Sequence, residues 1–183
     1  MSVVAVIPAR YASTRFPGKL LAKQTGKYLI QHVYEQVCRA SLVDSVLIAT
    51  DDERIGIACD EFGAKWRMTR TDHQSGTDRI AEVAAELDAD IIVNVQGDEP
   101  EIEPGNIDCL IELLHNNKQA DITTPAAVFG PDENIDNPNV VKVVTNRQGH
   151  ALYFSRWAIP YKRDKDSERP VYKKHIGIYA YRK

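Results

Sequence analysis

Short apolar runs rich in valine and isoleucine alternate along the chain with longer segments in which apolar residues recur at helical spacing. The apolar runs are continuous, as expected of strands buried on both faces, and cover residues 3–7, 46–49 and 91–95. The helical segments cover residues 29–40, 52–62 and 77–87. Strands that alternate with helices predict an α/β fold with a mostly parallel sheet flanked by helices.

After residue 121 the pattern changes to extended segments with little helix, at residues 123–128, 140–144, 151–154 and 176–181. A charged stretch at 162–169 predicts a mobile surface loop. We therefore expect a single domain over residues 1–183, with an α/β core at 1–120 and a smaller β-rich second part at 121–183.

Charge and composition narrow the possible partners. The chain has 183 residues and a net charge of −3 at pH 7, so no general attraction to nucleic acid is expected. No apolar run approaches the ~20 residues of a membrane span, and the first residues lack the basic region of a signal peptide. Three widely spaced cysteines are typical of a reducing compartment. These features predict a cytoplasmic protein that binds neither membranes nor nucleic acid.

The long connection after the first strand concentrates positive charge. Arg10, Arg15 and Lys19 are interleaved there with small and hydroxyl residues such as Ser13. In open α/β sheets ligands bind at the carboxyl ends of the strands, which is where this connection lies. A triphosphate needs several cations and hydrogen-bond donors, so we interpret the loop as a triphosphate site that differs from a Walker P-loop in its spacing. The alternative is a solvated basic loop.

Gln96, Gly97, Asp98 and Glu99 follow the buried run at 91–95. A carboxylate at the carboxyl end of a strand, facing a cationic loop, is the arrangement expected for a Mg²⁺ ligand. Alternatively, Asp98 or Glu99 caps the helix that we expect to begin near Pro104.

The stretch TRTDHQSGTDR, at residues 69–79, lies between a short predicted strand and a helix. Backbone N–H groups at such a helix start can receive an anion or the edge of a base. Ser75 or Thr77 could equally cap the helix, which is compatible with ligand binding. His73 by itself predicts only a solvated loop residue.

A late group contains Arg156, Arg163, His175 and Tyr179. Guanidinium groups bind carboxylates through paired hydrogen bonds, so the arginines favour an acidic sugar as the substrate. Taken one at a time, these residues are also typical of an exposed surface.

Together these stretches resemble the 3-deoxy-manno-octulosonate (KDO) cytidylyltransferases, also called CMP-KDO synthetases. The pattern of that family is followed in order by IPARYASTRFPGK, ATDDERI, MTRTDHQSGTDR, VNVQGDEP, NPNVVKVV, ALYFSRWAIPY and HIGIYAY. The resemblance implies a Rossmann-like nucleotidyltransferase fold and a homodimer. It also implies that CTP and KDO react to give CMP-KDO and pyrophosphate for lipopolysaccharide biosynthesis. Fixed cations and Mg²⁺ would then supply most of the catalysis.

The resemblance further assigns roles to the candidate residues. The residues that it implies for CTP binding are Arg10, Ser13, Arg15, Lys19, Gln74, Ser75 and Gly76. Catalytic roles are implied for Arg15, Lys19 and Asp98, and Asp98 is also the implied Mg²⁺ ligand. The residues that it implies for sugar binding are Gln96, Arg156, Arg163, His175 and Tyr179.

Members of that family continue beyond the equivalent of Lys183, through a VDTPEDL-like stretch whose Asp supplies a second Mg²⁺ ligand. That stretch is absent here, so we expect a chain that lacks the family's C-terminal segment and binds CTP. The stretch RPVYKKHIGIYAY is also reminiscent of relatives that activate the 8-amino analogue of KDO. Two alternatives therefore stay open: a cytidylyltransferase for that analogue, and a non-catalytic nucleotide-binding module.

Overall fold

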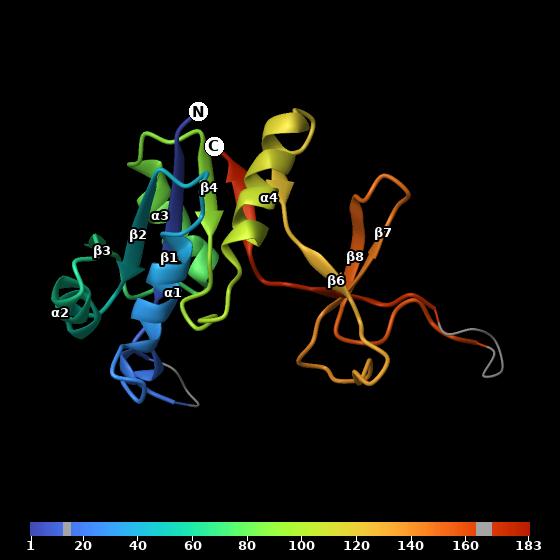
Figure 1. The fold of residues 1–183 in the computed structure, drawn as a ribbon, viewed down its shortest axis with the longest axis horizontal. Coiled ribbons are helices and arrows are strands. Elements are labelled where there is room, and N and C mark those ends of the chain that lie inside the picture. Colours follow the sequence, from blue (N-terminus) through green and yellow to red (C-terminus); the bar gives the residue numbers. More distant parts are fainter. Residues whose placement is uncertain (13–15, 164–169) are drawn as a thin grey trace. The chain divides into compact units, whose positions relative to one another are not determined.

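A six-stranded sheet, in the order β3-β2-β1-β4-β10-β5, is the centre of the first of two units in this computed structural model (Figure 1). The first unit comprises Met1–Thr123 and Ile178–Lys183, and the second comprises Thr124–Gly177. The structure describes residues 1–12, 16–163 and 170–183.

The first unit contains the parallel strands that the apolar runs predict. β1 pairs in parallel with β2 and β4, and β2 with β3, whereas β10 runs antiparallel to β4 and β5. The strands are β1 (Val3–Ala9), β2 (Ser45–Thr50), β3 (Trp66–Met68), β4 (Ile91–Asn94), β5 (Ile122–Thr123) and β10 (Tyr179–Arg182). β1 is buried along its whole length, which explains why its sequence is a continuous apolar run. The predicted α/β fold is confirmed.

Helices cover both faces of this sheet. They are the 3-10 helix η1 (Lys19–Leu21) and the α-helices α1 (Leu29–Val37), α2 (Glu53–Glu61), α3 (Gly76–Ala85) and α4 (Pro104–Asn116). α1 and α4 lie on one face and α3 on the other (Figure 1). On the α3 side, Val4 and Val6 of β1 form one core cluster with Ile80 and Val83 of α3. This packing fixes the start of α3 beside the carboxyl ends of the central strands.

The second unit is built on a four-stranded antiparallel sheet in the order β6-β9-β7-β8. Its strands are β6 (Ala126–Val128), β7 (Lys142–Thr145), β8 (Ala151–Ser155) and β9 (Lys173–His175). The pattern of extended segments after residue 121 therefore did indicate β structure.

The end of the chain departs from the grouping that sequence order suggests. Residues 178–183, which the apolar pattern groups with the β-rich part, return to the first unit, where β10 pairs with β4. An antiparallel strand joins a sheet through non-local pairing, which local periodicity does not reveal. Most of the predicted loop at 162–169 lies outside the described residues.

None of the helices in the described ranges combines the length and the apolar character that crossing a membrane requires.

Candidate functional site

An open cavity of about 470 Å³ lies in the first unit, at the carboxyl ends of β1 and β4 and the start of α3. Its lining is formed by Pro8, Arg10, Ala12, Lys19, Leu20, Gln74, Ser75, Gly76, Gln96, Gly97 and Asp98. The described residues that were expected to bind CTP all line this cavity, together with Gln96 and Asp98. Parallel strands that end at one edge of the sheet bring these distant stretches of sequence together.

The cationic loop closes back onto the end of β1. Gly18 has a φ of 69°, a conformation that favours glycine, and its N–H donates to the Tyr11 carbonyl at 2.9 Å. This turn places Lys19 so that its Nζ lies 2.7 Å from Asp98 Oδ2. Both side chains of the pair are nearly half exposed, so the pair adds little stability and can be exchanged for ligand contacts.

Two of the residues expected in this loop, Ser13 and Arg15, lie outside the described residues. Arg10 and Lys19 both line the cavity, which favours a ligand site over a merely solvated basic loop.

The segment after β4 approaches the backbone of β1 closely. A Cβ atom at Gly97 would lie 2.9 Å from the Pro8 carbonyl oxygen, so a larger residue there would force the two segments apart. Glu103 occupies the N-cap position of α4, without a side-chain capping hydrogen bond, and the capping alternative for Asp98 and Glu99 is therefore wrong. Asp98 instead points its carboxylate at Lys19 within the cavity.

Gln96 also lines the cavity, and its side chain is hydrogen-bonded to a buried asparagine of β4. Its Nε2 donates to Asn94 Oδ1 at 3.1 Å, and Asn94 is 1% exposed. The Nδ2 of Asn94 has no hydrogen-bond partner among the described residues. The structure thus places Gln96, which was expected to bind the sugar, beside the residues that were expected to bind CTP.

Ser75 caps α3 in a reciprocal arrangement with Asp78. The Ser75 hydroxyl accepts from the Asp78 N–H at 3.1 Å, and the Asp78 carboxylate accepts from the Ser75 N–H at 3.0 Å. The Ser75 hydroxyl also donates to Asp78 Oδ2 at 2.7 Å, and this bond, together with the one from the Ser75 N–H, lowers the pKa of the Asp78 carboxyl. The capping role is confirmed, and it fixes Gln74, Ser75 and Gly76 at the cavity wall.

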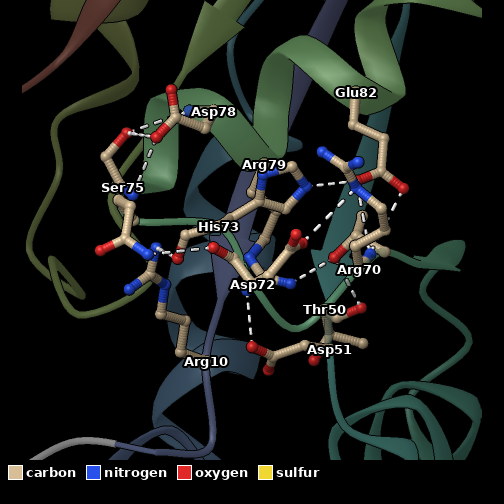
Figure 2. A network of polar contacts seen from close by, with 12 residues as sticks. Arg10, Thr50, Asp51, Arg70, Asp72, His73, Ser75, Asp78, Arg79 and Glu82 are labelled. Atoms are coloured by element: carbon tan, nitrogen blue, oxygen red, sulfur yellow. Dashed lines mark hydrogen bonds and ion pairs between the residues drawn. The ribbon is translucent and has the colours of Figure 1, made fainter.

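His73 ties the same turn to Arg10 and to α3 (Figure 2). Its carbonyl oxygen accepts from Arg10 Nη2 at 2.7 Å, and its Nε2 forms a close contact with Glu82 Oε2. The His73 side chain is only 5% exposed, so the interpretation of a solvated loop histidine is wrong. The hydrogen bond from His73 lowers the pKa of the Glu82 carboxyl. Arg10 therefore extends into the cavity from a position that is braced by the turn.

A fully buried arginine lies beneath this turn (Figure 2). Arg79 of α3 forms an ion pair with Asp51, Nη2 to Oδ2 at 2.6 Å, and its Nη1 donates to the Thr69 hydroxyl. Thr69 in turn donates from its hydroxyl to the Thr50 carbonyl at 3.0 Å. Arg79 thus joins the ends of β2 and β3 to the helix that carries the cavity wall.

The buried role of Arg79 was not predicted, although one signal for it was present in the sequence. Arg79 and Val83 are four residues apart, so they share one face of α3, and Val83 belongs to the apolar stripe. A charged residue on the buried face of a helix needs a partner of opposite charge.

The remaining residues expected to bind the sugar are divided between the units. Tyr179 belongs to the first unit, where it pairs in register with Asn94, and burial raises its pKa. Arg156, Arg163 and His175 belong to the second unit. Burial lowers the pKa of His175, whose ring contacts Phe154 edge-on with centroids 4.9 Å apart. Arg156 and Arg163 are exposed.

A cytidylyltransferase family profile matches residues 4–183. The chain belongs to this family. The 3-deoxy-manno-octulosonate cytidylyltransferase of Pelobacter propionicus is 54% identical, over 100% of this chain and 75% of that protein. The protein of the same name from Solibacter usitatus is 51% identical, over 99% and 71%. A solved structure of CMP:2-keto-3-deoxy-manno-octonic acid synthetase complexed with CTP matches with a TM-score of 0.94 and 46% identity, over 100% of this chain and 74% of that one.

These matches confirm the expected nucleotidyltransferase fold and the resemblance to the KDO cytidylyltransferases. The present cytidylyltransferase chain spans about three quarters of the length of these relatives.

The described part of this cytidylyltransferase contains no group of three or more His, Cys, Asp or Glu arranged to hold a metal ion. Asp98 provides one half-exposed carboxylate in the cavity. Mg²⁺ keeps several waters and usually binds through one or two carboxylates together with substrate phosphates. Asp98 therefore fits an ion that arrives with a nucleoside triphosphate better than a permanent metal centre.

Proposed function

We propose that this cytidylyltransferase transfers the cytidylyl group of CTP to KDO, giving CMP-KDO and pyrophosphate. The observation that carries the proposal is the cavity in which Arg10, Lys19 and Asp98 meet the start of α3. Cations and helix N–H groups suit a nucleoside triphosphate. The names of the relatives support KDO as the acceptor, and the comparisons give no support to its 8-amino analogue.

In the proposed reaction the anomeric hydroxyl oxygen of KDO attacks the α-phosphorus of CTP. The bond from the α-phosphorus to the bridging oxygen breaks, pyrophosphate leaves with the bonding electrons, and the hydroxyl proton passes to solvent. Negative charge builds on the phosphoryl oxygens, so groups fixed before the reaction stabilise the transition state best. Lys19 exchanges Asp98 for the phosphates, and Arg10 is already held in place by the His73 carbonyl.

Asp98 would hold Mg²⁺ together with the CTP phosphates. When bound, the ion would neutralise charge on those phosphates. Gln74, Ser75 and Gly76 would contact the nucleoside, because the Ser75 cap fixes them at the cavity wall. In the second unit, Arg156 and Arg163 would bind the sugar carboxylate through paired hydrogen bonds. Contacts with the sugar are also proposed for His175 of that unit and for Gln96 and Tyr179 of the first unit.

Pyrophosphate release is the direct test. The protein is incubated with CTP and Mg²⁺ and with KDO, its 8-amino analogue or a sialic acid, and a reaction without sugar gives the background. We expect release with KDO. Release only with the 8-amino analogue would reassign the acceptor. Calorimetric binding of CTP with no release for any sugar would favour a non-catalytic nucleotide-binding module instead.

A pair of variants tests the division of labour between the two ligands. Lys19→Ala removes a phosphate contact and should raise the KM for CTP by about 10- to 100-fold, the range expected for one charge-assisted hydrogen bond. Arg156→Ala should raise the KM for KDO by a similar factor and leave the KM for CTP nearly unchanged. Equal losses of both substrates in both variants would contradict this assignment.

The proposal extends to the setting of the reaction. CTP is a cytoplasmic metabolite, so we place the reaction in the cytoplasm, where CMP-KDO would supply lipopolysaccharide biosynthesis. We further propose a homodimer, because the second unit exposes large apolar side chains, among them Trp157 at 84% and Leu152 at 66%. Light scattering of the purified protein tests this, and a monomer at assay concentration would contradict it.

A further inference from the structure

Lys142 is a fully buried lysine in the second unit, with 0% of its surface exposed. It belongs to the stretch NPNVVKVV, to which neither the sequence pattern nor the proposed reaction gives a role. Burying an ammonium group is costly unless its hydrogens are fully bonded. The surroundings of this group therefore indicate what it does.

The Lys142 ammonium binds three backbone carbonyls. Its Nζ lies 2.8 Å from the Asn137 oxygen, 3.0 Å from the Val140 oxygen and 2.8 Å from the Arg156 oxygen. An ammonium has three hydrogens, so all of its donors are used. The Lys142 ammonium thus connects the turn before β7 to the segment after β8 through hydrogen bonds.

Arg156 is fixed to this turn at both ends. Its carbonyl accepts from Lys142, and its Nη1 donates to the Pro138 carbonyl at 2.7 Å. Pro138 directly follows Asn137, whose carbonyl the same lysine holds. The direction of the Arg156 guanidinium therefore depends on the turn, and the turn is held by Lys142.

The strand register places Lys142 between two of the residues expected to bind the sugar, Arg156 and His175. Lys142 pairs with Ser155 of β8 on one side and with Lys174 of β9 on the other. The next residues along those strands are Arg156 and His175, and the His175 N–H donates to the Val141 carbonyl at 2.8 Å. The buried Lys142 side chain thus belongs to the strand between β9, which ends at His175, and β8, which Arg156 directly follows.

We infer that Lys142 is a positioning residue for sugar binding, which acts by holding the Arg156 guanidinium in the direction that binds the substrate carboxylate. This inference rests on the proposed function, in which Arg156 binds the carboxylate of the sugar. A guanidinium with one N–H bound to Pro138 keeps the rest of its planar donor set for a carboxylate. Without the ammonium, the turn and Arg156 lose their common anchor.

Kinetics of Lys142→Met test the inference, because methionine keeps a long apolar side chain and removes the charge. The KM for KDO should rise about 10- to 100-fold, as expected when one charge-assisted contact is misplaced. The KM for CTP should stay within about twofold, because Arg10 and Lys19 belong to the other unit. Lys173→Met is the matched control: Lys173 is a partly buried lysine of β9 that donates to the Thr145 hydroxyl at 2.9 Å. The control should keep both KM values.

A double-mutant cycle separates positioning from general stability. In the Arg156→Ala background, Lys142→Met should change the KM for KDO by less than about twofold, because the group through which it acts is gone. An unchanged KM in the single variant, or equal effects of Lys142→Met in both backgrounds, would overturn the inference.

Folding of the second unit is checked by thermal melting and by amide hydrogen exchange. Lys142→Gln serves as a second variant, since its amide can still donate to two carbonyls, and an intermediate KM for KDO is expected. If both variants lose the second unit at the assay temperature, Lys142 is only a stabilising residue and the inference is wrong. Failure of the proposed function gives a different result, because the wild-type protein then releases no pyrophosphate with KDO.

Discussion

Two fully buried cations hold the two candidate binding regions of this molecule, and they do so with different chemistry. Arg79 in the first unit pairs with the Asp51 carboxylate and donates to the Thr69 hydroxyl. Lys142 in the second unit directs its hydrogens at three backbone carbonyls. Both side chains are 0% exposed. The first arrangement is an ion pair, whereas the second is a charge solvated by peptide dipoles.

Because the partners differ, removal of each cation should have a different consequence. Removing Arg79 leaves the Asp51 carboxylate, whose side chain is only 14% exposed, without its counter-charge. Removing Lys142 leaves three carbonyls that carry no formal charge, in Asn137, Val140 and Arg156, and none of these residues is fully buried, so water can replace the ammonium. We therefore expect Arg79 to matter mainly for stability and Lys142 mainly for the direction of Arg156.

The largest expected effect is the loss of stability in Arg79→Met. Breaking a buried ion pair by removing one partner costs about 3–5 kcal/mol in free energy of unfolding. Urea unfolding followed by Trp66 fluorescence in a Trp157→Phe background measures this in the first unit. Adding Asp51→Asn should recover part of the loss, because no buried charge then stays unpaired. Purely additive losses would show that the ion pair is unimportant.

Arg54→Met is the matched control for this experiment. Arg54 pairs with the neighbouring Asp52 at 2.7 Å, but its side chain is 58% exposed. Its removal should cost far less than removal of Arg79. If Arg79→Met and Arg54→Met lost similar free energy of unfolding, burial of the ion pair would not determine its contribution to stability.

A smaller effect on stability is expected for Lys142→Met, about 2 kcal/mol, since the uncharged carbonyls that lose the ammonium can bind water instead. Hydrogen exchange of the amides of β7, β8 and β9 measures it in the second unit. A loss as large as that of Arg79→Met would contradict the difference that we expect between the two cations, because carbonyl solvation would then matter as much as an ion pair.

The sequence predicts the frame around these cations better than the cations themselves. The continuous apolar runs predicted β1, β2 and β4, because strands buried on both faces must be apolar throughout. The polar residues that line the cavity were also expected to bind ligand, since parallel strands end at one edge of the sheet and the stretches after β1 and β4 carry polar motifs. The return of β10 to the first sheet was missed, because its pairing with β4 joins residues far apart in sequence.

Buried polar and charged side chains were missed for a related physical reason. His73, Arg79 and Lys142 look like surface residues in a sequence, because polar side chains are mostly exposed. Each becomes buried only when a partner from another element satisfies it: Glu82, Asp51 or a set of carbonyls. Such partners are defined by the tertiary fold, so only the helical spacing of Arg79 to Val83 carried a local signal.

A still smaller change in stability is expected at low pH, and it distinguishes the turn at His73, which contacts the Glu82 carboxylate, from the turn that Lys142 holds through carbonyls. The contact with His73 lowers the pKa of Glu82 in the folded protein, so Glu82 adds stability above its unfolded pKa and loses this contribution as the pH falls through its folded pKa. The difference in free energy of unfolding between wild type and Glu82→Gln should therefore be present at pH about 7 and vanish towards pH about 3. Urea unfolding at both pH values checks this, with Glu112→Gln on α4 as the control for loss of an exposed carboxylate.

The carbonyl partners of Lys142 do not titrate, so the difference in free energy of unfolding between wild type and Lys142→Met should be nearly the same at both pH values. The opposite result would contradict this distinction between a carboxylate partner and carbonyl partners. In that result the free-energy difference for Lys142→Met vanishes at low pH while the difference for Glu82→Gln persists.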